Sequence, residues 1–172
     1  MAEHIQTLES LRRISRSHLR GAHESSHATP KAGQAPILPM SVAYLAHVAI
    51  ECALKVRLLY RSGCASKEEL AAKQPSIHRA MFQGKQGHDL QLVATQVRLR
   101  AAMVSEGKAW KEDDCWKRMA SLNRPYSLRY GFEALTKLEA EQELARAEEI
   151  VSAILAGTPT LSLNSAKSRG KR

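Results

Sequence analysis

One short segment carries side chains suited to contact a phosphate and a base. Residues 124–130 read Arg-Pro-Tyr-Ser-Leu-Arg-Tyr and supply Arg124, Tyr126, Arg129 and Tyr130. Guanidinium groups bind phosphate through paired hydrogen bonds, and a tyrosine ring stacks on an unpaired base. The cluster is therefore our first candidate for contact with RNA or a nucleotide. The alternative is structural, with Tyr130 in the core and Arg129 bonded to a carboxylate on a neighbouring helix.

A second candidate is a polar stripe on an otherwise apolar helix. His47, Glu51 and Lys55 are four residues apart and share one helix face, with Tyr44 at its edge. Such a stripe could line a groove that holds a nucleotide, or form a charged dimer contact. The alternative is an ordinary solvated face with one ion pair, worth a few tenths of a kcal/mol.

The third candidate is the pair His88 and Asp89, which precedes an apolar helical pattern. A histidine beside a carboxylate allows proton transfer. The structural interpretation is that Asp89 caps the helix by accepting from free backbone N–H groups, with His88 packed beside it. We favour the structural interpretation of this pair.

Other chemistries lack support in the sequence. His23 and His27 have the spacing of a metal pair, but they have only Glu24 nearby, so we predict no metal site. Phosphate-binding loop, dinucleotide-binding, nucleophile-elbow and zinc-protease motifs are missing, and we predict no cofactor. Three cysteines without a Cys-x-x-Cys pair are typical of a reduced, cytoplasmic protein.

The elements that position these residues are all expected to be helices. The 172 residues are rich in Ala, Leu, Gln, Glu, Lys and Arg and poor in β-branched runs. Apolar spacing predicts helices over residues 2–19, 41–62, 66–73, 89–106, 111–122 and from about 127 or 133 to 156. Ser41 is the predicted cap of the second helix, and residues 74–88 are predicted to be mainly loop. The fold class is therefore all-α, an up-and-down helical bundle of four main helices plus one or two short helices.

The predicted domain covers residues 1–156, with a loop over 21–40, and residues 157–172 form a mobile basic tail. The formal net charge is +9, and both ends of the chain are basic while the middle is nearly neutral. The tail cations could add diffuse phosphate contacts if the protein meets nucleic acid; they are Lys167, Arg169, Lys171 and Arg172. A solubilising tail is the alternative. No segment has the length and apolarity of a membrane span.

Three motifs in order resemble those of HEPN (higher eukaryote and prokaryote nucleotide-binding) domains. Residues 46–55 fit the pattern Ala-x-x-Ala-x-Glu-x-Ala-Leu-Lys, in which Glu51 stands at the family's glutamate. Residues 88–90 read His-Asp-Leu, and Arg129-Tyr130 stands where the family often has an Arg-Tyr pair at or near the start of its last core helix. The resemblance implies a helical bundle, usually dimeric, from toxin–antitoxin or phage-defence systems.

One departure bears on activity. The resemblance implies that active members cleave RNA without metal through an Arg-x4-6-His motif in a late helix, yet the last histidine of this chain is His88. We therefore expect a non-cleaving domain that binds RNA or a nucleotide or mediates assembly. The alternative is a metal-independent ribonuclease toxin with a diverged active site. The nearly all-round apolar helix over 41–62 predicts a homodimer, or a heteromer with a partner protein.

Overall fold

The computed structural model describes residues 7–28, 38–83, 88–99, 103, 114–121, 124–131 and 134–158. It confirms the all-α helical bundle, because these residues form helices and no strand beyond one isolated bridge between Thr7 and Ser66. The named helices are α1 (Leu8–His27), α2 (Pro39–Arg61), α3 (Lys67–Lys73), α4 (Pro75–Phe82), α5 (Leu90–Gln96), α7 (Asp114–Met119), α8 (Arg124–Arg129) and α9 (Lys137–Ala156).

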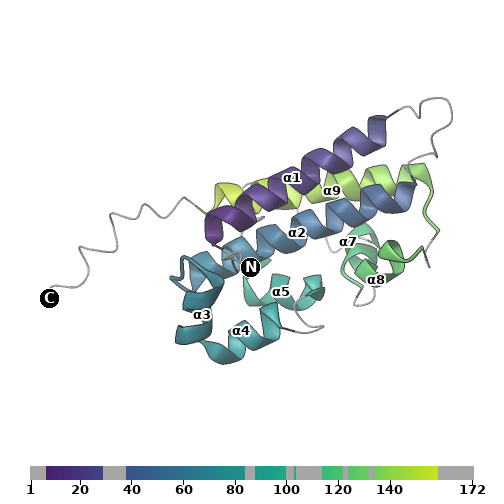
Figure 1. The fold of residues 1–172 in the computed structure, drawn as a ribbon. Helices are drawn as coiled ribbons and strands as arrows, with labels where there is room; N and C mark the ends of the chain where they lie inside the picture. The colour runs from purple at the N-terminus through teal and green to yellow at the C-terminus, as the bar shows by residue number, and fades with distance from the viewer. Residues whose placement is uncertain are drawn as a thin grey trace, which may run out of the picture.

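The three long helices α1, α2 and α9 pack side by side (Figure 1). The start of α1 lies beside the end of α2, where Leu8 N–H donates to the Ala65 carbonyl at 2.9 Å. It also lies beside the end of α9, where the buried Arg12 guanidinium donates to the Thr158 carbonyl. Helix α1 is therefore antiparallel to both α2 and α9.

Helix α2 is the centre of the core. Ile50, Leu54 and Leu59 are fully buried on it, and Ile150 and Ile154 of α9 pack into the same cluster. Burying each such side chain contributes about 1.5–3 kcal/mol. The apolar circumference of α2 is therefore covered largely within the chain itself.

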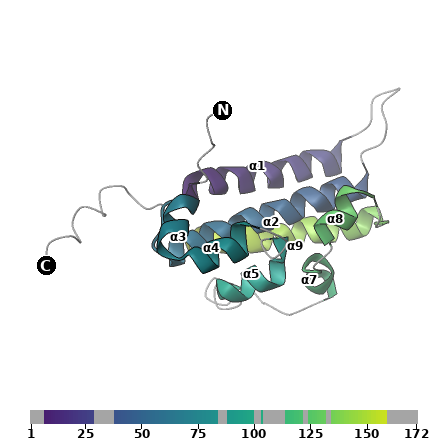
Figure 2. The same cartoon turned by 60° about the horizontal axis from the view of Figure 1, so that its bottom comes forward.

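Helices α4, α5, α7 and α8 cover the side of the long helices that faces away from α1, whereas α3 begins beside the start of α1 (Figure 2). Helices α5 and α8 lie against α2, and α7 lies against α9. Trp116 of α7 is 2% exposed, and its indole N–H donates to Gln91 Oε1 of α5 at 3.0 Å. The packing of α5 and of α8 against α2 places the start of α5 and the helix α8 next to the same part of α2.

The first helix differs from its prediction at both ends. It begins after Thr7, whose hydroxyl accepts from Ser10 N–H at 3.0 Å while Ser10 Oγ accepts from Thr7 N–H. It continues past Gly21 to His27, so the predicted loop over 21–40 is wrong for residues 21–27. Packing of the fully buried Ala22 outweighs the cost of about 1 kcal/mol for a helical glycine.

Prolines account for two further corrections. Helix α2 begins at Pro39 after Leu38, so Ser41 lies inside the helix and is not its cap. Helix α4 begins at Pro75 within the segment 74–88 that was predicted to be mainly loop. Proline suits the first helical position because that residue needs no N–H donor and its φ is already helical.

Helix α5 covers only the first part of the helix predicted over 89–106, of which residues 100–102 and 104–106 lie outside the described part of the chain. It ends at Gln96, and Arg98 has a φ of 53°, which a right-handed helix cannot accommodate. Arg57 Nε donates to the Val97 carbonyl at 3.1 Å and satisfies a group freed by this break. Helix α7 ends at Met119, short of the predicted end at 122, and residues 111–113 lie outside the described part of the chain.

The last helix starts later than predicted and ends as predicted. Its cap is Thr136, which exchanges hydrogen bonds with Glu139, and Gly157 follows its last residue. Thr158 is fully buried, so packing extends two residues beyond the predicted boundary at 156. The remaining tail residues lie outside the described part of the chain. Within that part, no helix is long and apolar enough to cross a membrane.

Candidate functional site

The stripe of His47, Glu51 and Lys55 is buried. These residues are 1%, 8% and 9% exposed, so the interpretation as a solvated face is wrong. Lys55 Nζ donates to Glu51 Oε1 at 2.6 Å and lies 5.3 Å from the centroid of the Phe82 ring. The ion pair predicted from the four-residue spacing is therefore present, but it lies in the interior, where losing one partner is costly.

Glu51 also binds the third candidate. Its second carboxylate oxygen, Oε2, is 2.9 Å from His88 Nδ1, and the His88 side chain is 46% exposed. Burial alone would raise the pKa of Glu51, but the charge of Lys55 and the hydrogen bonds from Lys55 and His88 outweigh it, so the pKa lies below its ordinary value. Glu51 is therefore an ionised, buried carboxylate that orients the His88 ring.

Asp89 performs the structural role that the sequence predicted. Its Oδ1 accepts from Leu92 N–H at 3.0 Å and caps α5. This cap holds His88 at the start of α5, directly over α2. Because His88 Nδ1 faces the Glu51 carboxylate, Nδ1 carries the proton in the neutral ring and Nε2 carries the lone pair.

A pocket of about 180 Å³ brings the candidates from separate segments together. Glu51 of α2, His88 before α5, and Tyr126 and Arg129 of α8 all line it. Its remaining walls are Tyr44, Val48 and Pro125. Residues that are 78 positions apart in the sequence, such as Glu51 and Arg129, therefore lie around one cavity.

Helix α8 presents its polar residues outward. Tyr126 and Tyr130 are 45% and 61% exposed, so the interpretation that places Tyr130 in the core is wrong. The guanidinium of Arg129 lies 5.8 Å from the centroid of the Tyr130 ring, and no described carboxylate forms an ion pair with it. Arg129 and Tyr130 lie at the end of α8, in the segment that precedes the last core helix α9.

Several predicted residues lie outside this pocket or outside the description. His47 is buried on α2 and is not among the residues that line the pocket. Arg124 begins α8, and its side chain is not among those described. The tail candidates Lys167, Arg169, Lys171 and Arg172 fall after residue 158, the last one that the structure describes.

The apolar walls of the pocket were not predicted as site residues. Val48 lies four residues after Tyr44 and three before Glu51, so all three share one helix face. This spacing could have identified Val48 as a site residue from the sequence. Pro125 is buried beside Tyr126, and nothing in its residue type marked it as a site residue. Together the lining supplies one cation, one carboxylate, one imidazole and two phenol rings around a small cavity.

Comparison with known proteins identifies no relative of this chain. No protein-family model, curated protein or solved structure matches the chain. Among the described residues, no group of three or more His, Cys, Asp or Glu side chains could hold a metal ion. The function is therefore inferred from the pocket.

Proposed function

We propose that this protein binds one nucleotide unit of RNA, or a free nucleotide, in the pocket between α2, α5 and α8, without cleaving it. The observation that carries the proposal is the convergence of Tyr126, Arg129 and the Glu51–His88 pair on one cavity. A cavity of about 180 Å³ is smaller than pockets of drug-sized ligands, which start near 300 Å³, and it suits a single base or sugar-phosphate unit.

Each polar group has a distinct part in this binding. Arg129 is exposed and has no carboxylate partner among the described residues, so it binds a phosphate without first breaking an ion pair. The half-exposed Tyr126 ring stacks on a base. His88 Nε2 accepts a hydrogen bond from a ribose hydroxyl or a base N–H group, since Glu51 fixes the ring tautomer.

The biological setting of this proposal rests on the resemblance to HEPN domains. In that setting the protein is an RNA-binding or assembly component of a toxin–antitoxin or phage-defence system in the cytoplasm. The four tail cations add phosphate contacts that carry no sequence information. Together with the basic N-terminal third, they favour an anionic ligand.

Arg129→Ala and Tyr126→Ala test the binding site. We expect each variant to raise the Kd for a fluorescein-labelled oligouridine roughly 10-fold to 100-fold, because a charged hydrogen bond or a stacked base contributes about 1.5–3 kcal/mol. Fluorescence anisotropy at fixed salt measures the Kd, and AMP as a competitor separates nucleotide from RNA binding. Arg79→Ala is the matched control, since Arg79 is exposed on α4 and does not line the pocket.

A specific observation favours ribonuclease activity as a second candidate. A buried carboxylate that bonds Nδ1 leaves His88 Nε2 free to act as a general base, and Arg129 lines the same cavity. Nε2 would take the proton of a ribose 2′-hydroxyl. The 2′-oxygen would then attack the adjacent phosphorus and release the 5′-oxygen, which takes a proton from water, leaving a 2′,3′-cyclic phosphate.

Total RNA incubated with the purified protein in EDTA separates the two candidates. Binding without cleavage predicts intact RNA for the wild type and for His88→Ala. The ribonuclease predicts fragments that end in a cyclic phosphate, lost in both His88→Ala and Arg129→Ala. Unchanged oligouridine binding in the Arg129→Ala and Tyr126→Ala variants would refute the pocket as the site of either activity.

A further inference from the structure

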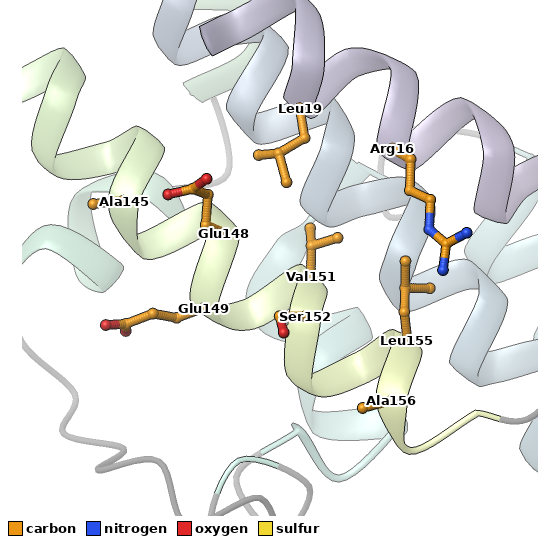
Figure 3. Close-up of a pocket in the computed structure, with 9 residues that line it drawn as sticks. All are labelled: Arg16, Leu19, Ala145, Glu148, Glu149, Val151, Ser152, Leu155 and Ala156. Atoms are coloured by element: carbon orange, nitrogen blue, oxygen red, sulfur yellow. The ribbon is translucent and has the colours of Figure 1, made fainter.

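A second hollow lies between α1 and α9, apart from the pocket. It is an open groove of about 800 Å³ with Leu19, Val151 and Leu155 along its apolar floor (Figure 3). Arg16 stands at one end, and Glu148 and Glu149 stand at the other. Glu148 is bonded to His23, and Glu149 accepts from Arg146 at 2.7 Å, but both glutamate side chains stay about half-exposed and open to a second cation from outside the chain. The groove and the nucleotide pocket share no lining residue.

We infer that this groove is the surface through which two copies of the chain form a symmetric dimer. In an interface with twofold symmetry the same patch serves both copies, so every contact occurs twice. Such a patch must be complementary to itself, with opposite charges at its two ends. The α1–α9 groove meets this requirement, because a twofold axis near Ser152 places Arg16 of each copy against the glutamates of the other.

The positions along the helices support this register. Arg16 lies at the level of Leu155, since Arg12 bonds Thr158 one turn away and α1 is antiparallel to α9. Glu149 lies six residues before Leu155 on α9, about 9 Å along the helix at 1.5 Å per residue. The two charged ends are therefore about equally distant from Ser152, as a twofold axis at that residue demands.

The outer side of α9 also permits close approach. Ala145, Ser152 and Ala156 line the groove, are exposed, and recur at spacings of seven and four residues. Small side chains at this spacing let two antiparallel helices pack near one another along a continuous seam. Among the described residues, none forms a hydrogen bond or ion pair with Arg16, which is exposed on α1.

This interface differs from the one that the sequence suggested. The prediction of a dimer relied on the apolar circumference of α2, which the structure covers with α1, α9, α5 and α8. A dimer through the α1–α9 groove leaves both nucleotide pockets uncovered, because the pockets lie on the side of α2 that faces α5 and α8. Each copy would then bind its ligand with its own residues alone.

Charge reversal tests the interface with the full chain. We expect light scattering across a concentration series to show a dimer for the wild type and a monomer for both Arg16→Glu and Glu149→Arg. In a dimer of either variant the introduced side chain would face a side chain of the same charge on the other copy. An equimolar mixture of the two variants should recover the dimer. In that mixed dimer the introduced glutamate of one copy faces the introduced arginine of the other. The second contact joins the native Glu149 of the first copy to the native Arg16 of the second, so both contacts are attractive.

Arg13→Glu is the control, since Arg13 is exposed on α1 and does not line the groove. It makes the same change in net charge as Arg16→Glu and should remain a dimer. Circular dichroism shows whether each variant keeps its helices. A monomeric wild type, a dimeric Arg16→Glu variant, or a mixture that stays monomeric would each overturn the inference. Oligouridine binding by the Arg16→Glu monomer should equal that of the wild type, so failure of this inference is distinguishable from failure of the nucleotide site.

Discussion

Replacing Glu51 by leucine lowers the free energy of unfolding by about 3–5 kcal/mol, because it leaves the buried Lys55 ammonium without its carboxylate. The Lys55 and Glu51 side chains are only 11% and 10% exposed, so water cannot replace the lost partner. Urea denaturation with linear extrapolation measures the change. A loss this large is a substantial part of the roughly 5–15 kcal/mol by which most domains are stable.

The double variant Glu51→Leu with Lys55→Met is the matched control. It removes both charges and fills the same space with apolar atoms, which is often neutral or stabilising. We expect it to recover most of the stability lost by Glu51→Leu. A single variant that costs less than about 1 kcal/mol, or a double variant as unstable as the single one, would show that the pair is not buried as described.

The Glu51–Lys55 pair also makes the free energy of unfolding depend on pH in the acid range. Because the pKa of Glu51 is lower in the folded protein than its ordinary value of 4.5, the unfolded chain binds the proton more readily. The stabilisation is therefore complete above the ordinary pKa and is lost as the pH falls through the folded pKa. The double variant lacks this carboxylate and should lose less stability over the same acid range.

Trp116→Ala is expected to cost about 3–5 kcal/mol, the usual loss when a buried aromatic ring leaves a cavity. Among the described residues Trp116 is the largest fully buried side chain, and its hydrogen bond to Gln91 joins α7 to α5. The loss of this link should also loosen the short helices that wall the pocket. Thermal and urea unfolding measure the stability, and the oligouridine Kd reports the effect on the pocket.

Tyr130→Ala is the corresponding surface control, because 61% of Tyr130 is exposed. It should change stability by no more than about 0.5 kcal/mol. Comparable losses from Trp116→Ala and Tyr130→Ala would contradict the burial of α7 against the rest of the bundle. Trp116→Phe should fall between the two, since it keeps most of the ring volume and loses the hydrogen bond.

The sequence predicted the helices better than it predicted their ends. Apolar spacing located α2 and α9 because both bury long periodic stripes. The predicted helix ends were wrong where proline can have either of two effects. Pro39 and Pro75 begin helices in this protein, although proline in other contexts ends a helix. The capping pair of Thr136 and Glu139 was a further readable signal, and it marks the start of α9.

The site was predictable in its residues but not in its geometry. Glu51, Tyr126 and Arg129 were candidates from residue type and spacing, and His88 was a candidate for which we favoured a structural role. Nothing in the sequence placed these residues around one cavity. That placement depends on α5 and α8 packing on the same side of α2. Burial of the polar stripe also escaped prediction, because spacing alone cannot tell a solvated helix face from one covered by α4 and α5.

The bond between Arg12 and Thr158 joins residues 146 positions apart and has a consequence for how the chain folds. Helices α1 and α2 are neighbours in sequence, so they can pair early as a hairpin, whereas α9 is the last of the named helices to be synthesised. During translation the apolar side of α2 that α9 covers therefore stays exposed until the chain through residue 158 has left the ribosome. A chain cut short before α9 should therefore be a target for chaperones and proteases, even though it already contains every residue that lines the pocket between α2, α5 and α8.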